Sequence, residues 1–336
     1  MKSLSRFVAA LALLAAGCGQ APDLVIYVSH DQEFAEPLIR QFEKETGLTV
    51  HAEFDVEANK TIGLVRRIRE ESKRPRCDVF WNNEAGHSVS LADDGLLTPY
   101  ESPSARDIPA QFRDPEHRWT GFGARARILI VNTDLADPKT IRSMWDLVDP
   151  KWAGKAAIAR PLNGTTLTHM AALYAALGPA KAEEYATKIA ELGKSGAINL
   201  ASGNSLVARL VGDGECAFGW TDTDDFAVAL ERGKHVAAVY PDADGIGTLL
   251  IPNTIMLVKG APHEAVAKRF IDWVLKPETE RALAFSRSAQ IPVRANVERP
   301  ASVAAPGSFK ALDVDFRKVG AGLEACAERM KVLFVQ

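Results

Sequence analysis

Near its N-terminus the chain alternates between strand-like and helix-like patterns, and this alternation restricts the fold more than any other feature. Residues 23–30 ("DLVIYVSH") are an apolar, β-branched run with the length of a strand buried on both faces. Apolar residues then recur at helical spacing, at Phe34, Leu38 and Phe42. A second strand, a second helix and the short strand at residues 77–81 follow. This β-α-β-α-β series predicts a parallel sheet with helices on its faces.

Strand-like and helix-like patterns also alternate over residues 121–247, and they predict a second lobe. A proline-rich, charged connection at residues 101–119 separates it from the first set. We expect the late strands, near residue 250, to return to the first lobe, which makes a hinge between the two lobes. The predicted fold class is α/β, with each lobe a mostly parallel sheet flanked by helices. The expected segments are an N-lobe (residues 23–120 and about 248–290), a C-lobe (about 121–247) and a C-terminal helical segment packing across the lobes (291–336).

The composition is that of an ordinary soluble globular protein of 336 residues, with 47% hydrophobic and 25% charged residues. A chain of this length can bury a sizeable core in each of two lobes. The net charge of -3 supplies no basic field that would hold a nucleic acid. Nucleic-acid binding is therefore not expected.

The first 17 residues have the pattern of a secretory signal and are not expected to belong to the fold. Lys2 and Arg6 precede an apolar run at residues 7–16, which is too short to span a membrane. Gly17 and Cys18 follow, and this junction resembles a bacterial lipoprotein cleavage site with lipid added to Cys18. A plain signal peptide cut nearby is the alternative. The expected location is periplasmic or at the cell surface, with a lipid anchor to the membrane.

The other cysteines, Cys77, Cys216 and Cys326, are widely spaced and odd in number. They match no zinc motif and no dense disulfide framework. Buried free thiols are the expected state, and one disulfide remains an alternative in an oxidising compartment.

Polar residues follow three predicted strands at the points where those strands end. They are His30, residues 82–84 ("NNE") with Asn83 and Glu84, and the acidic turn at residues 221–225 ("TDTDD"). Ligands of open α/β sheets bind beyond the carboxyl ends of the strands. Packing alone does not require three aspartates within four positions. The sequence therefore predicts one ligand site built from these three clusters.

Five segments, in order, resemble an extracellular solute-binding protein of bacterial ABC importers, in the branch that contains ferric-iron-binding proteins. They include the opening strand, turn and helix, a "DVF" strand followed by an acid, and a crossing strand similar to "GRARVLIYNT". They are residues 24–50, 78–100, 121–134, 145–161 and 204–220.

The resemblance implies a two-lobed, type II periplasmic-binding-protein-like fold and a role in transport rather than catalysis. The implied function is that of the substrate-binding component of an ABC importer, which delivers its cargo to a permease in the inner membrane. The implied cargo is ferric iron, captured in the interlobe cleft with carbonate or phosphate as a synergistic anion. The protein is expected to be a monomer.

The resemblance also implies ligand positions. The family's first ligand follows the first strand, its acidic ligand follows the "DVF" strand, and its two adjacent tyrosines follow a strand of the second lobe. The matching positions here are His30 or Asp31, Asn83 or Glu84, and Asp224 with Asp225. No two tyrosines are adjacent in this chain. Bound iron would therefore lack the tyrosinate pair and its charge-transfer colour.

The candidate ligands are mostly hard oxygen donors. Asp222, Asp224, Asp225 and Glu84 supply carboxylates, which suit Fe³⁺, Mn²⁺, Mg²⁺ or Ca²⁺. The imidazole of His30 favours a transition metal. The alternatives of the same class are a divalent metal, a cationic metabolite held by carboxylates and by aromatic walls, or an organophosphonate. The non-binding alternative is a surface turn whose aspartates cap the next helix.

A separate set of residues is suited to an anion. Arg125 and Arg127 alternate on a strand and therefore share a face. Thr165 and Thr166 open a helix, whose N-terminal amides and hydroxyls form an anion site. In the resembled family an anion often completes the coordination of the metal from this lobe. The alternative is that Arg127 pairs with an acid for structural reasons and that Thr165 only caps the helix.

A secreted metal-dependent hydrolase is the alternative from a different class, because clustered carboxylates also support two-metal chemistry. The chain shows no evident nucleophile and no substrate lid for such a reaction.

Overall fold

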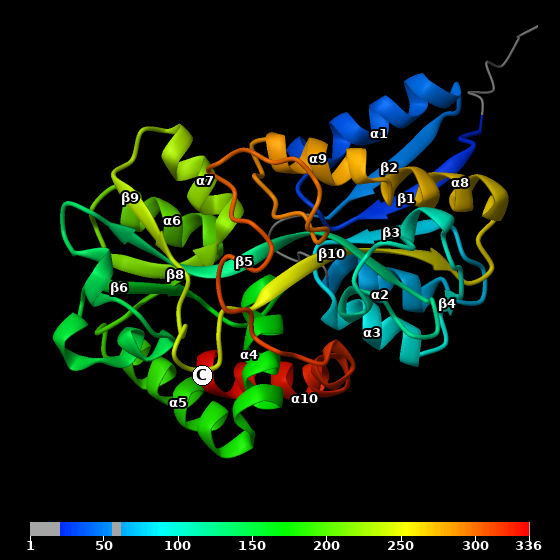
Figure 1. Cartoon of the computed structure of the whole chain (residues 1–336). Helices are drawn as coiled ribbons and strands as arrows, with labels where there is room; N and C mark the ends of the chain where they lie inside the picture. Colours follow the sequence, from blue (N-terminus) through cyan, green and yellow to red (C-terminus); the bar gives the residue numbers. More distant parts are fainter. Residues whose placement is uncertain (1–20, 56–61, 336) are drawn as a thin grey trace, which may run out of the picture.

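The computed structural model describes residues 21–55 and 62–335, which form two α/β lobes joined by a shared strand (Figure 1). The expected signal peptide and its anchor residue Cys18 lie outside the described residues. Strand β5 (Thr120–Asn132) runs from one lobe into the other and pairs in both sheets. The α/β fold class predicted from the sequence is confirmed.

The sheet of the first lobe has three parallel strands and one long returning strand. β1 (Leu24–Val28) lies between β2 (Val50–Phe54) and β3 (Val79–Asn82). β10 (Leu250–Val258) runs antiparallel to β3 and to β5, and the short β4 (Leu97–Thr98) pairs with it. Successive residues of β1 enter different cores, which explains why its sequence is apolar on both faces.

Helices cover both faces of this first sheet. α1 and α8 pack on one face, and α2 and α3 on the other (Figure 1). The predicted stripe Phe34, Leu38 and Phe42 is buried on α1, which ends at Gly47 in a left-handed conformation. The helices of this lobe are α1 (Gln32–Thr46), α2 (Ile62–Glu70), α3 (Gly86–Asp93), α8 (Glu264–Val274) and α9 (Pro277–Phe285).

The second sheet repeats this plan. β6 (Ala156–Ala159) lies between β7 (Asn199–Ala201) and β8 (Phe218–Asp222), and all three are parallel. β5 runs antiparallel to β8 and to β9 (Val236–Val239). Each sheet is therefore mixed rather than mostly parallel, because the strands that leave and re-enter a lobe run against the parallel ones.

Helices also cover both faces of the second sheet. α4 and α5 pack on one face, and α6 and α7 on the other (Figure 1). They are α4 (Gly164–Leu177), α5 (Pro179–Lys194), α6 (Asn204–Gly212) and α7 (Thr223–Glu231). Short 3₁₀ helices lie in the connections: η2 (Pro103–Ala105), η3 (Ala110–Phe112), η4 (Pro138–Thr140), η5 (Met144–Val148) and η6 (Pro150–Trp152).

The hinge region is formed by β5 and β10. The first part of β5 pairs with β10, and from Arg127 onward it pairs with β8, where Arg127 lies opposite Asp222. β10 has a register shift between Pro252 and Asn253. Gly123 has a φ of 44°, and a Cβ there would lie 2.9 Å from an oxygen of Gln290. Both strands therefore have an irregular backbone position where the two sheets meet.

The C-terminal helix α10 (Phe316–Phe334) packs against α3 of the first lobe and against α4 of the second (Figure 1). The approach to α3 is very close, because a Cβ on Gly320 would lie 2.4 Å from the Cβ of Val89. The helix therefore contacts elements of both lobes. The exact lobe boundaries near residues 121, 248 and 291 stay a prediction.

Cys77, Cys216 and Cys326 are buried, and none is in a disulfide. Burial raises the pKa of each thiol. This agrees with the expected buried free thiols. In the described parts of the chain, no helix is both long and apolar enough to cross a membrane.

Candidate functional site

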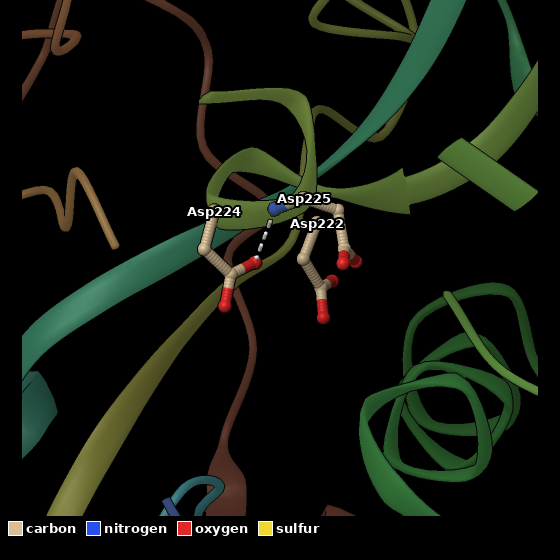
Figure 2. Close-up of side chains that lie close together, drawn as sticks. All are labelled: Asp222, Asp224 and Asp225. Carbon is tan, nitrogen blue, oxygen red and sulfur yellow. Dashed lines mark hydrogen bonds between the residues drawn. The ribbon is translucent and has the colours of Figure 1, made fainter. Parts of the chain in front are cut away.

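The acidic turn expected from the sequence lies at the junction of β8 and α7. Asp222 is the last residue of β8, and Asp224 and Asp225 lie in the first turn of α7. One carboxylate oxygen from each lies within 4.8 Å of the others. Figure 2 shows the three side chains extending from the ribbon to the same side. The fold thus gathers the three aspartates into one cluster instead of spreading them over a solvated turn.

Asp222 is held by several donors. Nη1 of Arg127 lies 2.7 Å from its Oδ1. Its Oδ2 accepts hydrogen bonds from the hydroxyl of Thr165 at 2.7 Å and from the amide of Asn204 at 3.2 Å. Burial opposes its charge, but Arg127 and Arg125 outweigh burial and hold the pKa of this carboxyl below its usual value. Asp222 is thus an ionised, buried acid that ties β8 to β5, α4 and α6.

Arg127, the partner of Asp222, is fully buried and has further contacts within the second lobe. Its Nε donates to Nδ1 of His169 at 3.3 Å, and its guanidinium lies over the ring of Trp220. Burial and the neighbouring guanidinium hold the pKa of His169 well below its usual value, so the imidazole is neutral and can accept this hydrogen bond.

Asp224 and Asp225 each accept a hydrogen bond from a residue of the acidic turn itself. Oδ1 of Asp224 accepts the backbone N–H of Asp225 at 3.0 Å, which is the contact drawn in Figure 2. Oδ2 of Asp225 accepts the hydroxyl of Thr221 at 2.8 Å. Asp222 occupies the N-cap position of α7 without a side-chain capping bond. The side chain of Asp222 therefore does not cap α7, whereas Asp224 satisfies one N–H of its first turn.

Arg125 lies between the lobes. Its Nη1 is 3.4 Å from Oδ2 of Asp224, and its Nη2 donates to the backbone oxygen of Asn83 in the first lobe. Burial opposes its charge, but Asp224, Asp222 and other nearby carboxylates outweigh burial and raise the pKa of the guanidinium. Arg125 therefore stays charged and contacts both walls of the site.

These groups border a cavity of 620 Å³ that residues of both lobes line. The second lobe contributes the three aspartates and the first turns of α4 and α6, including Thr165, Thr166 and Asn204. The first lobe contributes Asp31 and Asn83. Among the described residues, no tyrosine lines this cavity.

The structure brings Asp31, Asn83, Arg125 and the aspartate cluster together, but two expected ligands lie elsewhere. His30 is buried between Trp81 and Phe34, and its Nε2 lies 3.1 Å from Nε2 of Gln290. Neither His30 nor Glu84 is among the residues that line the cavity.

Glu84 is occupied by its own turn. Its Oε1 accepts the backbone N–H of His87 at 2.9 Å, and its Oε2 accepts that of Gly86 at 2.6 Å. Oε2 also accepts the hydroxyl of Thr168, on α4 of the second lobe, at 2.7 Å. The carboxylate thus accepts hydrogen bonds from the N-terminal N–H groups of α3 and links the two lobes instead of facing the cavity.

The expected anion residues are only partly directed at the cavity. Thr165 and Thr166 line it, whereas Arg127 does not. The Thr166 hydroxyl donates to Oδ1 of Asn204 at 3.0 Å. Asn204 was missed by the sequence reasoning, although Gly203 before it marks the start of a helix, α6, whose first turn lines the cavity. The structural pairing of Arg127, considered as an alternative above, is what the geometry shows.

The match to known families covers most of the chain. Residues 37–311 match the family described as bacterial extracellular solute-binding protein. The chain belongs to this family. Its members bind and carry solutes, so this extracellular solute-binding protein is not an enzyme and the hydrolase alternative is set aside. The family resemblance inferred from the five sequence segments is confirmed.

Individual relatives match more than nine-tenths of the chain. The chain is 26% identical to "Iron uptake protein A1" of a Synechocystis strain over 94% of this chain and 92% of that protein. Its fold is similar to that of "Ferric binding protein from Campylobacter jejuni", with a TM-score of 0.83, 23% identity and coverage of 92% and 99%. It is also similar to the periplasmic binding protein AfuA from Actinobacillus pleuropneumoniae with fructose-6-phosphate bound, with a TM-score of 0.79, 22% identity and coverage of 93% and 98%. The two-lobed binding-protein fold is thereby established.

Proposed function

We propose that this solute-binding protein is the substrate-binding component of an ABC importer and that it captures ferric iron, together with an anion, between its lobes. The observation that carries the proposal is the cluster of Asp222, Asp224 and Asp225 beside the interlobe cavity. The names of relatives such as "Iron uptake protein A1" support iron as the cargo.

We place the metal between the acidic wall of the second lobe and the facing wall of the first. Asp224 and Asp225 supply carboxylates from α7, and Asp31 and Asn83 supply oxygens from the opposite side. Hard oxygen donors suit Fe³⁺. Asp222 supports this cluster by holding α4 and α6, because its own oxygens already accept several hydrogen bonds.

We place the accompanying anion, carbonate or phosphate, at the first turns of α4 and α6. Thr165 and Thr166 offer hydroxyls there, and the N-terminal N–H groups of both helices favour negative charge. A cargo that contacts both lobes favours the closed state through its higher affinity for that state. Hinge closure at β5 and β10 then presents the loaded protein to the permease.

A second candidate cargo is an organic phosphate or phosphonate. The cavity of 620 Å³ has room for more than an ion, and helix N-termini border it. The related fold of AfuA has fructose-6-phosphate bound. A divalent metal or a cationic metabolite at the aspartates is the remaining alternative. Lipid anchoring at Cys18, a monomeric state and delivery to an inner-membrane permease belong to the same proposal.

The test is the melting temperature of the metal-free mature protein against chelated Fe³⁺, divalent metals, cationic metabolites and organic phosphates. A ligand that binds only the folded state raises this temperature as its concentration rises. We expect a rise with Fe³⁺ that needs carbonate or phosphate, and no visible charge-transfer band because no described tyrosine lines the cavity. A rise with an organic phosphate and none with Fe³⁺ would replace iron by the second candidate.

A further inference from the structure

The side chain of Arg125 lies among the carboxylates that are expected to hold the cargo. Its Nη1 is 3.4 Å from Oδ2 of Asp224 and 3.8 Å from Oδ2 of Asp222. The side chain of Arg125 is 4% exposed, so little water screens these charges from one another. Part of the positive charge that the cluster requires is therefore supplied by the chain itself.

Two features distinguish Arg125 from Arg127. The bond from Arg127 to Asp222 is short, at 2.7 Å, whereas the contact from Arg125 to Asp224 is 3.4 Å long. In addition, Nε of Arg125 is buried and makes no hydrogen bond within the described residues. A buried guanidinium with a long contact and an unused donor is only partly satisfied in its position. Arg127 is thus anchored at its carboxylate partner. Arg125 is held by the bond from its Nη2 to the backbone oxygen of Asn83, whereas its contact with the carboxylate of Asp224 is long and can be replaced by a stronger cation.

We propose that Arg125 is a resident counter-cation, which neutralises Asp224 in the ligand-free protein and which the cargo must displace, so that it determines which cations bind. The proposal rests on the proposed function in taking a cation as the cargo. An arginine cannot lose its proton in a protein, so the charge leaves the carboxylate only by movement of the side chain.

Because the cargo has to displace the guanidinium of Arg125, its affinity depends on the charge of the cation. A monovalent cation that replaces the guanidinium exchanges one positive charge for another and gains little. A multivalent cation attracts every carboxylate of the cluster more strongly and compensates for the lost contact. The displaced guanidinium, with its unused Nε, can then donate to the anion that accompanies the metal. Arg125 therefore links cation selectivity to the presence of an anion.

The experiment compares Arg125→Gln and Arg125→Lys with the unchanged protein, using Mn²⁺ alone as the probe and calorimetry and melting temperature as readouts. Arg281→Gln is the matched control, because it removes the same charge from an exposed residue that pairs with Glu298. Removing the counter-cation should tighten Mn²⁺ binding by at least about tenfold. The metal-free Arg125→Gln protein should also melt lower, because its carboxylates lose a neutralising charge, and Mn²⁺ should restore its melting temperature.

Arg125→Lys keeps the charge and should bind Mn²⁺ as weakly as the unchanged protein, as should Arg281→Gln. The proposal is overturned if Arg125→Gln binds Mn²⁺ no more tightly than the unchanged protein. It is also overturned if Arg125→Lys, which keeps the charge, binds Mn²⁺ about tenfold or more tightly than the unchanged protein, and this comparison decides the matter if Arg125→Gln fails to fold. If no form of the protein binds Fe³⁺, the proposed iron cargo fails, while the Mn²⁺ comparison still tests Arg125.

Discussion

Replacing Asp224 and Asp225 together by alanine is expected to abolish ferric iron binding and to leave the protein folded. The change removes the two carboxylates that α7 directs toward the cavity. Loss of two charged ligands should weaken binding by more than about a hundredfold, since loss of supporting residues alone reaches that range. Relief of repulsion between crowded carboxylates only partly offsets the lost contact between Asp224 and the buried Arg125, so the variant should fold but melt below the unchanged protein. Isothermal titration with chelated Fe³⁺ measures the affinity, and circular dichroism checks the fold.

The chain offers a matched control for this double variant. Asp93 and Asp94 are also adjacent, but they are exposed at the end of α3 and do not line the cavity. Asp93→Ala with Asp94→Ala makes the same change in net charge and should bind iron as the unchanged protein does. If the two double variants bound Fe³⁺ with equal affinity, the metal site would not be on α7.

Asp222→Ala should produce the largest loss of stability of any substitution in the site. It leaves the guanidinium of Arg127, which is fully buried, without its carboxylate partner. Removing one member of a buried pair costs about 3–5 kcal/mol, because an uncompensated buried charge remains. The free energy of unfolding, measured in urea, should fall by that amount. By contrast, Glu298→Ala breaks the exposed pair with Arg281 and should change it by only about 0–1 kcal/mol.

A double substitution tests whether the loss of stability in Asp222→Ala comes from the unpaired charge of Arg127 or from lost packing. Combining Asp222→Ala with Arg127→Met removes both charges and should recover much of the lost stability, since apolar groups tolerate burial. If Asp222→Ala alone lowers stability no more than Glu298→Ala does, then Asp222 does not hold the second lobe together as described.

Local sequence patterns were enough to predict the β-α-β-α-β series that begins the first lobe, but not α3 or β4. β1 and β3 are short apolar runs buried on both faces, and α1 carries a regular apolar stripe that ends at a glycine. Strand direction was harder to predict, because an apolar run does not encode the direction of its neighbour. β5 and β10 run antiparallel to the strands beside them, as crossing and returning strands must. The mixed sheets follow from that connectivity and not from any residue pattern.

The site was predictable where a rule about strand ends applied. That rule pointed to Asn83 and to the acidic turn, which line one cavity, and to His30, which does not line it. Asp31, which also lines the cavity, was implied only by the family resemblance. It could not show that Glu84 is occupied by the backbone N–H groups of its own turn, because this depends on the exact backbone path into α3. For the same reason, the sequence could not show that Arg127 makes a short bond to Asp222 while the contact of Arg125 with Asp224 is long, although both arginines lie on one strand.

The central claim is that α7 holds the cargo metal, and anomalous X-ray diffraction at the iron edge tests it most directly. Crystals of the mature protein, loaded with Fe³⁺ in the presence of carbonate or phosphate, would be measured on both sides of the edge. The account predicts one strong anomalous peak within bonding distance of Asp224 and Asp225. A peak at other residues, or an organic phosphate bound at α4 and α6 with no iron at the aspartates, would contradict it.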